Sequence, residues 1–424
     1  KMLGSFSSST NSQQEEDAAV DHHHHHRPSS LSPHRRHFLH QIQVQPPLLP
    51  PSSTSTITPL RQLLISSAEL ISRSDFTSAH RLLAILSSKS SPFGDSTERL
   101  THQFTRALSL RLNRQLTLTP TTQPTTDHDL SLLQSSYLTL NQITPFIRFT
   151  HLTANQAILE AVDGCSAVHV IDFDIMHGVQ WPPLMQALAE RFPTPTLRIT
   201  GSGSDPDMLR RTGDRLAKFA LTLGLKFQFH ELVILSHEDP ASATSSILLL
   251  PNEILAVNCV LYLHKLLTDP ERARLFLRRL RAMDPAVVTV AEREANNNDP
   301  VFLRRFAAAL DNYAAIFDSL EATLPPSSGE RLMVERVWFG REIGDVVAGE
   351  GNGRLERHER FLWWEMMMRG AGFGLVPLST FALSQSRLLL RLHYPSEGYQ
   401  ICVVNESFFL GWKNQLLFSV SSWH

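Results

Sequence analysis

The sequence predicts an α/β protein in which a layer of helices precedes a mainly parallel sheet. Three observations support this fold class. Leucine and alanine recur at helical spacing between residues 59 and 162, strand-like and helix-like segments alternate after Gly164, and strand-like segments return near residue 424. Such alternation is typical of βαβ units, in which helices cover both faces of a parallel sheet.

Residues 1–58 precede this pattern and differ from it in composition. They are rich in Ser, Thr, Pro, Gln and His and show neither helical nor strand periodicity, which predicts a disordered tail. The run His22–His26 is open to two interpretations, a metal-binding or engineered tract and a polar repeat without a specific role, of which the second is preferred. The net charge of −2 gives no overall attraction to nucleic acid, and the three separated cysteines suggest a reducing compartment.

The first ordered region is predicted to be a helical layer over residues 59–162. Apolar residues recur one helical turn apart from Leu60 to Ile71 and again over the next segment. A third helix is expected after Gly94, because Asp95 and Glu98 have the spacing of a capping box. Two further helices are expected at 129–142 and 145–162.

The remaining residues, 163–424, are predicted to form the α/β core. Strands are expected at 168–173, 197–201, 226–230, 254–258 and 286–291, with helices at 180–191, 206–223, 270–283, 300–322 and 353–370. Antiparallel strands are expected at 387–393, 399–404 and 416–421. An open sheet with such an edge resembles the Rossmann-type sheet of a class I methyltransferase. No apolar run is long enough to span a membrane.

Several motifs then follow in a fixed order along the chain. The first is a strand-like motif, and it is followed by a motif spread over forty residues and by a tryptophan-rich region. Their residues are Val168, His169, Val170, Ile171 and Asp172; Pro300, Tyr313, Arg341 and Glu342; and Trp364, Gly372, Leu410, Trp412 and Trp423. In this order they resemble the VHIID, PFYRE and SAW motifs of the GRAS family, with Val170 where isoleucine is more usual.

The resemblance covers about residues 58–423, and it implies a GRAS domain over 59–424. Residues 91–99 and 317–326 further resemble the Lateral suppressor (Scarecrow-like) branch. That branch implies a plant nuclear regulator of transcription with a role in axillary (lateral) meristem initiation. The partners implied are other transcription factors or GRAS proteins, with a homo- or heterodimer as an open alternative, and contact with DNA is expected to be indirect.

An enzyme is the less favoured alternative. A nucleotide or S-adenosylmethionine site needs glycines after the first strand, whereas this chain has Asp174, Ile175 and Met176 there. Asn258 ends the fourth strand but lacks the residues of a catalytic Asn-Pro-Pro-Tyr turn. No phosphate loop, nucleophile elbow or metal-binding helix is recognisable, so we expect no catalytic, cofactor or metal residues. Asp172, Asp174 and His177 either bind a small molecule or, as preferred, satisfy local backbone donors.

Two further interpretations concern a basic helix and the C-terminal strand. Arg274, Arg278 and Arg281 belong to an arginine-rich helix that either contacts DNA or partners or, as preferred, forms a solvated face. His169 is expected to be a core histidine with satisfied hydrogen bonds. Strand periodicity near the C-terminus places Trp423 on the side of Leu417, where we expect it to be buried.

Overall fold

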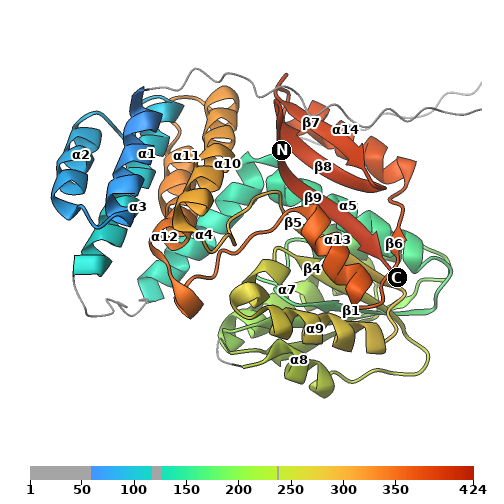
Figure 1. Ribbon diagram of the computed structural model, residues 1–424. Coiled ribbons are helices and arrows are strands. Elements are labelled where there is room, and N and C mark those ends of the chain that lie inside the picture. The colour runs from blue at the N-terminus through green and yellow to red at the C-terminus, as the bar shows by residue number, and fades with distance from the viewer. Residues whose placement is uncertain (1–58, 117–126, 236–237) are drawn as a thin grey trace, which may run out of the picture. The chain divides into compact units, whose positions relative to one another are not determined.

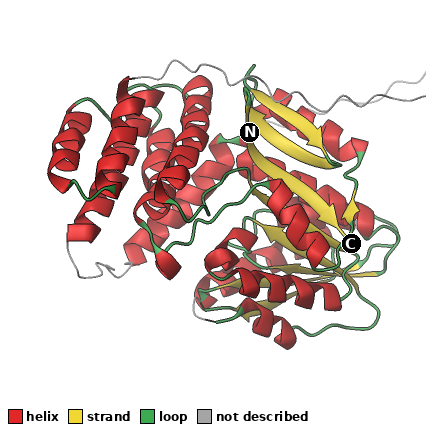
Figure 2. Ribbon diagram, in the orientation of Figure 1, coloured by secondary structure: helices red, strands yellow, loops and turns green. Residues whose placement is uncertain are grey.

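The computed structural model describes residues 59–116, 127–235 and 238–424. All of them belong to one compact unit, Thr56–His424. The predicted disordered tail, residues 1–58, lies outside the described residues. Figures 1 and 2 show a group of helices next to an α/β layer built on one twisted sheet. Among the described residues, no helix is both long and apolar enough to cross a bilayer.

The N-terminal helices form as the leucine spacing predicts. They are α1 (Pro59–Ser72), α2 (Phe76–Ser88), α3 (Ser96–Leu116), α4 (Asp127–Ile143) and α5 (Pro145–Ala161). In α1 the apolar stripe Leu64, Ala68 and Ile71 is buried against its neighbours, since these residues recur about every turn. The Asp95 side chain accepts a hydrogen bond of 2.8 Å from the backbone N–H of Glu98, which is the expected cap of α3.

The helical layer is built from two separate parts of the chain. Helices α10 (Phe302–Thr323), α11 (Gly329–Met333) and α12 (Gly340–Ala348), with the π-helical turn η3 (Val334–Phe339), come from the second half of the sequence. Helix α3 packs against α10 and α12, and Figure 1 shows these helices beside the blue N-terminal ones. Helix α5 packs instead on β4, β5 and β9 of the sheet. The helical layer is therefore not confined to residues 59–162.

An ion pair network around Arg99 connects these two parts. The Arg99 guanidinium is buried, and its Nε donates to Oε2 of Glu335 at 2.9 Å. Its Nη1 donates to Oε2 of Glu321 at 2.5 Å. These contacts join α3 to α10 and η3. They also bring together residues 91–99 and 317–326, the two stretches that resemble the Lateral suppressor branch.

The sheet has the order β3-β2-β1-β4-β5-β9-β8-β7, and β6 also pairs with β9. The first five are parallel: β1 (Ala167–Asp172), β2 (Thr196–Gly203), β3 (Phe227–Val233), β4 (Ile254–Val260) and β5 (Val287–Arg293). The others are antiparallel: β6 (Leu375–Val376), β7 (Tyr399–Val404), β8 (Ser407–Trp412) and β9 (Gln415–Trp423). This is the predicted methyltransferase-like sheet with an antiparallel C-terminal edge.

Helices cover both faces of the parallel part, as expected. Val170 of β1 packs with α6 (Trp181–Ala189) and α7 (Pro206–Leu223), while the next residue, Ile171, packs with α9 (Pro270–Ala282) and α13 (Phe361–Gly370). Successive side chains of a strand point to opposite faces, which explains why Val170 and Ile171 are both apolar and both buried. A short helix, α8 (Pro240–Ala243), precedes β4.

Two expected elements are wrong. Residues 387–393 are not a strand but the end of α14 (Thr380–His393), whose buried residues Ala382, Ser386 and Leu390 are four apart. Residues 353–360 are not helical: after a short turn they run extended, and they bury Arg354, Glu356 and His358 in alternation. The prediction of a helix here was wrong because it relied on the spacing of apolar residues, whereas the buried residues of this segment are charged.

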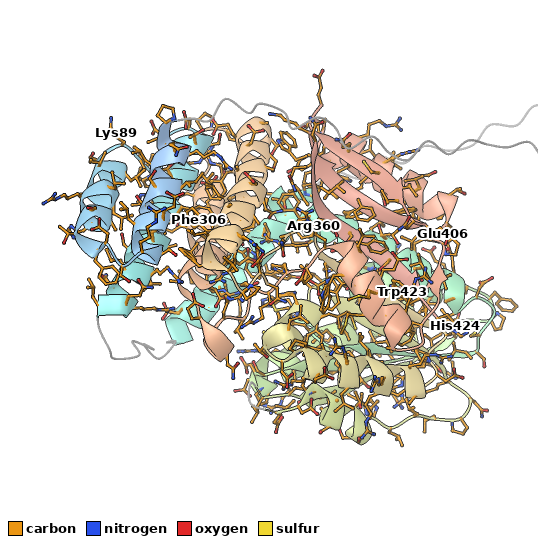
Figure 3. The ribbon with its side chains drawn as sticks, in the orientation of Figure 1. Lys89, Phe306, Arg360, Glu406, Trp423 and His424 are labelled. Atoms are coloured by element: carbon orange, nitrogen blue, oxygen red, sulfur yellow. The ribbon has the colours of Figure 1, made fainter. Side chains whose placement is uncertain are left out.

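The aromatic residue Trp423, labelled in Figure 3, is buried at 0% exposure, as predicted, and its Nε1 donates to Oγ of Ser421 at 2.9 Å. Its expected side of the strand is wrong. The pairing of β9 with β8 shifts by one residue between Leu410 and Gly411 of β8. Leu416 therefore shares a cluster with Trp423, while Leu417 packs on the other face. An extra residue in one strand of a pair reverses the alternation beyond it.

We predict that Trp423→Ala lowers the free energy of unfolding by about 3–5 kcal/mol, because it leaves a large cavity in the core. Removing Trp423 and His424 together should reduce the soluble yield and the melting temperature. Urea unfolding followed by circular dichroism measures the effect. Leu362→Ala, which truncates a side chain that is 68% exposed on α13, is the matched control and should change little. A truncated protein that melts normally but no longer binds its partners would contradict the prediction.

Candidate functional site

A cleft opens at the carboxyl ends of β1 and β4, between the sheet and the helical layer. It encloses about 770 Å³ of empty space, its open mouth included. This edge is the switch point of the sheet, because β1 connects to β2 on one side and pairs with β4 on the other. The sheet contributes Asp172, Asn258 and Arg293, and the helical layer contributes Tyr137, Trp338 and Glu342.

The loop after β1 packs against the end of β2 and lines the cleft. The Ile175 backbone N–H donates to the carbonyl of Ser202 at 3.1 Å, which fixes the loop against the end of β2. The buried Ile175 side chain lies so close to Gly201 that a Cβ at that glycine would be 2.7 Å from Ile175 Cδ1. Two residues of this loop have a positive φ: Gly178 at 62°, where a glycine is favoured, and Met176 at 48°, in spite of its side chain.

The carboxylate of Asp172 is the centre of a satisfied hydrogen-bond network. It accepts from Nε1 of Trp181 at 2.9 Å, from Nδ2 of Asn258 at 3.2 Å and, more weakly, from the backbone N–H of Asp174 at 3.4 Å. Burial raises its pKa to about 7, although the hydrogen bonds from Asn258 and Trp181 act in the opposite direction. Two of these three donors are side chains, whereas the preferred interpretation expected Asp172 to satisfy backbone donors.

The predicted polar cluster is only partly assembled. Asp172 and Asp174 both line the cleft, and Asp174 forms an ion pair with Lys265. His177 is not part of the cleft lining, and its ring stacks on Tyr137 with 6.3 Å between the ring centroids. The three side chains therefore do not form a single binding group.

The VHIID residues Val168, His169, Val170, Ile171 and Asp172 form β1, in the middle of the parallel strands. His169 is a buried histidine with satisfied hydrogen bonds. Its Nε2 lies 2.8 Å from Oγ1 of Thr200, and Arg198 donates to its Nδ1 at 3.1 Å. Burial, reinforced by the charge of Arg198, lowers its pKa to about 3, so the ring is neutral. Since Nδ1 accepts, the proton is on Nε2.

Three of the four PFYRE residues lie at the junction between the sheet and the helices. The Tyr313 hydroxyl donates to Oε2 of Glu342 at 3.0 Å, and Nη1 of Arg293 donates to the same oxygen at 2.7 Å. The third residue, Arg341, donates to Oε1 of Glu356 at 3.0 Å. The fourth, Pro300, is exposed ahead of α10 and contributes to neither contact.

A second buried network, which the sequence analysis missed, lies next to these residues. His264 comes from the turn η2 (Leu263–Thr268), Glu292 from β5, and Glu356 and His358 from the extended segment 354–360. Burial alone would lower the pKa of His264, but the two carboxylates outweigh it and raise that pKa to about 9. Burial likewise opposes ionisation of Glu292, yet His264 holds the Glu292 pKa at about 2. Polar residues alternating at 354, 356 and 358 were the signal that could have revealed an extended segment here.

The SAW residues serve the packing of the C-terminal strands and of α13. Trp364, Leu410, Trp412 and Trp423 are all buried. Nε1 of Trp412 donates to Oδ2 of Asp318 at 2.6 Å and so connects β8 to α10. Gly372 has a φ of 93° at the end of α13, a conformation that favours glycine.

The arginines of α9 lie on the outer face of that helix. Arg274 pairs with Glu271, and Arg281 pairs with Asp284 at 3.0 Å and donates to the carbonyl of Gly372 at 3.2 Å. Arg278 is exposed. Acidic neighbours therefore accompany two of the three candidate DNA or partner contacts.

The comparisons with known proteins agree with this architecture. The sequence matches the GRAS domain family over residues 60–424. It is 53% identical to "Scarecrow-like protein 18" of Arabidopsis thaliana, over 86% of this chain and 91% of that protein. It is 44% identical to "Protein MONOCULM 1" of Oryza sativa subsp. japonica, over 86% of this chain and 88% of that protein.

A solved structure shares the fold as well. The crystal structure of SCL7 from Oryza sativa superposes with a TM-score of 0.73 at 35% sequence identity, and the match covers 86% of this chain and 99% of that one. The match of the sequence over nearly all described residues and the agreement of the folds lead to one conclusion: this chain belongs to the GRAS domain family.

Proposed function

We propose that this chain is a nuclear regulator of plant transcription that acts by binding other proteins and has a role in axillary meristem initiation. Its membership of a family of plant regulators supports the first part of this proposal. The likeness to Scarecrow-like protein 18 and MONOCULM 1, together with the resemblance of residues 91–99 and 317–326 to the Lateral suppressor branch, supports the developmental role.

The observation that carries the proposal is the loop after β1. In a sheet of this order a cofactor would bind at the switch point, with the backbone of a glycine-rich loop close to it. Here Ile175 lies against Gly201 at that position, and the Asp172 carboxylate is engaged by Trp181 and Asn258. A regulatory protein that has kept the sheet without the nucleotide site accounts for this arrangement better than an enzyme does.

The helical layer is the preferred partner-binding surface. Most of the regularly spaced leucines pack inside the protein, so the side chains available to a partner are others. Ile85 of α2 is 42% exposed, Phe93 before α3 is 77% exposed, and Leu110 of α3 is 40% exposed. Apolar side chains of this kind, presented from helices, can bind the apolar face of another helix.

We predict that Ile85→Glu and Leu110→Glu together abolish the recovery of partner proteins, because a charge opposes burial of the surface in a complex. The measurement is co-purification from plant nuclear extract with the full chain. The circular dichroism melt should stay unchanged, since both side chains are exposed. Phe381→Glu, at an exposed position of α14 in the α/β layer, is the control and should retain partners. Equal recovery with both proteins would count against the helical layer.

We predict that the chain does not bind S-adenosylmethionine, because Asp174, Ile175 and Met176 stand where the cofactor loop needs glycines. Isothermal titration of the purified chain with the cofactor should give no saturable heat. Micromolar binding would be incompatible with this interpretation of the loop.

Direct DNA binding through α9 is the competing function, since Arg274, Arg278 and Arg281 all lie outside the core. We predict that the purified chain without partners binds plant promoter fragments only weakly, and no better than unrelated DNA, across a salt series. Specific binding that persists at physiological salt and is lost on Arg274→Glu, Arg278→Glu and Arg281→Glu would favour the DNA-binding alternative.

A further inference from the structure

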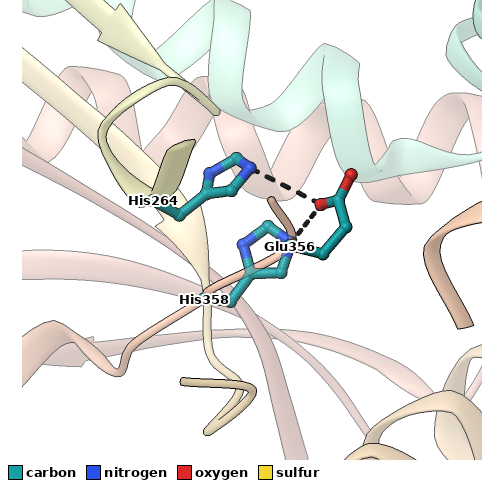
Figure 4. A group of neighbouring side chains, drawn as sticks. All are labelled: His264, Glu356 and His358. Atoms are coloured by element: carbon teal, nitrogen blue, oxygen red, sulfur yellow. Dashed lines mark ion pairs between the residues drawn. The ribbon is translucent and has the colours of Figure 1, made fainter. Parts of the chain in front are cut away.

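The buried side chains of His264, Glu356 and His358 converge on one point next to the cleft. Nε2 of His264 lies 3.6 Å from Oε2 of Glu356, and Nε2 of His358 lies 3.1 Å from the same oxygen. Figure 4 shows both imidazoles directed at that carboxylate from different segments of the chain. One possible ligand atom from each residue lies within 4.8 Å of the others. We propose that these three side chains bind a divalent transition-metal ion of the zinc type.

The distances agree with tetrahedral coordination. Zinc binds histidine nitrogen and carboxylate oxygen at roughly 2.0–2.2 Å, which places neighbouring ligand atoms of a tetrahedron about 3.3–3.6 Å apart. The two nitrogen–oxygen separations, 3.6 and 3.1 Å, lie at or close to this range. Two histidines and one carboxylate are a frequent ligand set for a zinc ion that keeps a fourth position open.

The state of His358 supports the proposal independently. This side chain is 2% exposed, and its ring nitrogens face two carboxylates without the alignment of a hydrogen bond: Nε2 lies 3.1 Å from Oε2 of Glu356, and Nδ1 lies 3.6 Å from Oε2 of Glu292. A buried polar group without an aligned hydrogen bond is unfavourable. In a metal site the nitrogen lone pair points at the ion and not at the neighbouring ligand oxygen. The close approach of Nε2 to Glu356 without an aligned hydrogen bond is therefore what a shared ion would produce.

The surroundings of His264 have the arrangement of a supported metal ligand. Its Nδ1 lies 2.8 Å from Oε2 of Glu292, while its Nε2 faces Glu356, so that a metal ion would take the place of the proton that the two carboxylates otherwise hold on Nε2. Histidine ligands of metals usually donate their second ring N–H to a carboxylate, which fixes the tautomer and the orientation of the ring. Glu292 is thus a positioning residue in the proposed site.

The carboxylates around the proposed site and its access from the cleft also favour binding of a cation. The two buried carboxylates of Glu292 and Glu356 face the histidines, and Arg341 supplies one compensating charge at Glu356. All three proposed ligands border the cleft, which gives an ion a route from solvent. The site is separate from the exposed surface of α2 and α3, so the proposal goes beyond the regulatory function and does not depend on it.

Zinc binding to the full chain tests the proposal. Since the run His22–His26 can itself bind metal, the protein used should carry serine at those five positions. After removal of metal with a chelator, titration of Zn²⁺ against a chromophoric competitor should show one tight site per chain. Substitution with Co²⁺ should give the visible bands of four-coordinate cobalt with nitrogen and oxygen ligands, a readout that needs no change at a proposed ligand.

Variants then assign the ligands. His358→Ala should weaken zinc binding more than about 100-fold, because loss of a supporting residue alone weakens it about 10–100-fold. Glu292→Gln, which keeps the shape of the positioning residue, should fall within that smaller range. His80→Ala, at an exposed histidine of α2, is the matched control and should bind zinc like the parent protein.

Two results would overturn the proposal. One is the absence of a saturable zinc site in the parent protein, in which case a proton shared between His264 and Glu292 balances the buried charge. The other is zinc binding that is equally tight in His358→Ala and in the parent, provided both melt alike. If His358→Ala fails to fold, the cobalt spectrum of the parent decides: bands of octahedral cobalt, as at a surface site, would also reject the proposed coordination.

Discussion

The ion pair between Arg293 and Glu342 is the interaction on which the two layers of this protein depend. Arg293 ends β5, and Glu342 lies in α12 of the helical layer. Both are buried, and the Tyr313 hydroxyl from α10 donates to the same carboxylate oxygen. Breaking such a buried pair from one side is typically unfavourable by about 3–5 kcal/mol, because the other charge then has no partner. The guanidinium also lies 5.2–5.6 Å from the ring centroids of Tyr313, Phe339 and Phe418, which come from both layers.

This junction explains why the chain returns to the helical layer after β5. A sheet of this type needs only helices on its two faces, yet α10, α11 and α12 pack mainly on the N-terminal helices, with α10 also contacting β8 and β9. The segment 354–360 then leads back to the sheet, and it is extended because it must place Glu356 and His358 beside Glu292. Buried charges thus determine the path of the chain between α12 and α13, because apolar packing alone would allow several different paths.

The sequence predicted those parts of the fold that rest on apolar periodicity. The helices of residues 59–162 and the five parallel strands follow from leucine spacing and from the apolar character of β1, and the burial of Trp423 follows from strand alternation. The prediction failed where polar residues are buried, as at Glu356, or where one face of a helix carries few apolar side chains, as in α14. The side of Trp423 was wrong because a single extra residue in β9 cannot be recognised from periodicity. Two reasons explain why the group of His264, Glu356 and His358 was missed. His264 precedes the other two by at least 92 residues, and those two lie in an extended segment that was predicted to be helical.

The position of β9 between β5 and β8 has a consequence for how the protein is made. About 120 residues separate β5 from β9 in the sequence, so the edge of β5 has no partner while this stretch is synthesised. At roughly 5–20 residues per second, the ribosome needs about 6–25 s to complete it. During that time an apolar parallel strand presents an open hydrogen-bonding edge, which is a template for aggregation. This edge of β5 is protected only once β9 emerges and completes the sheet.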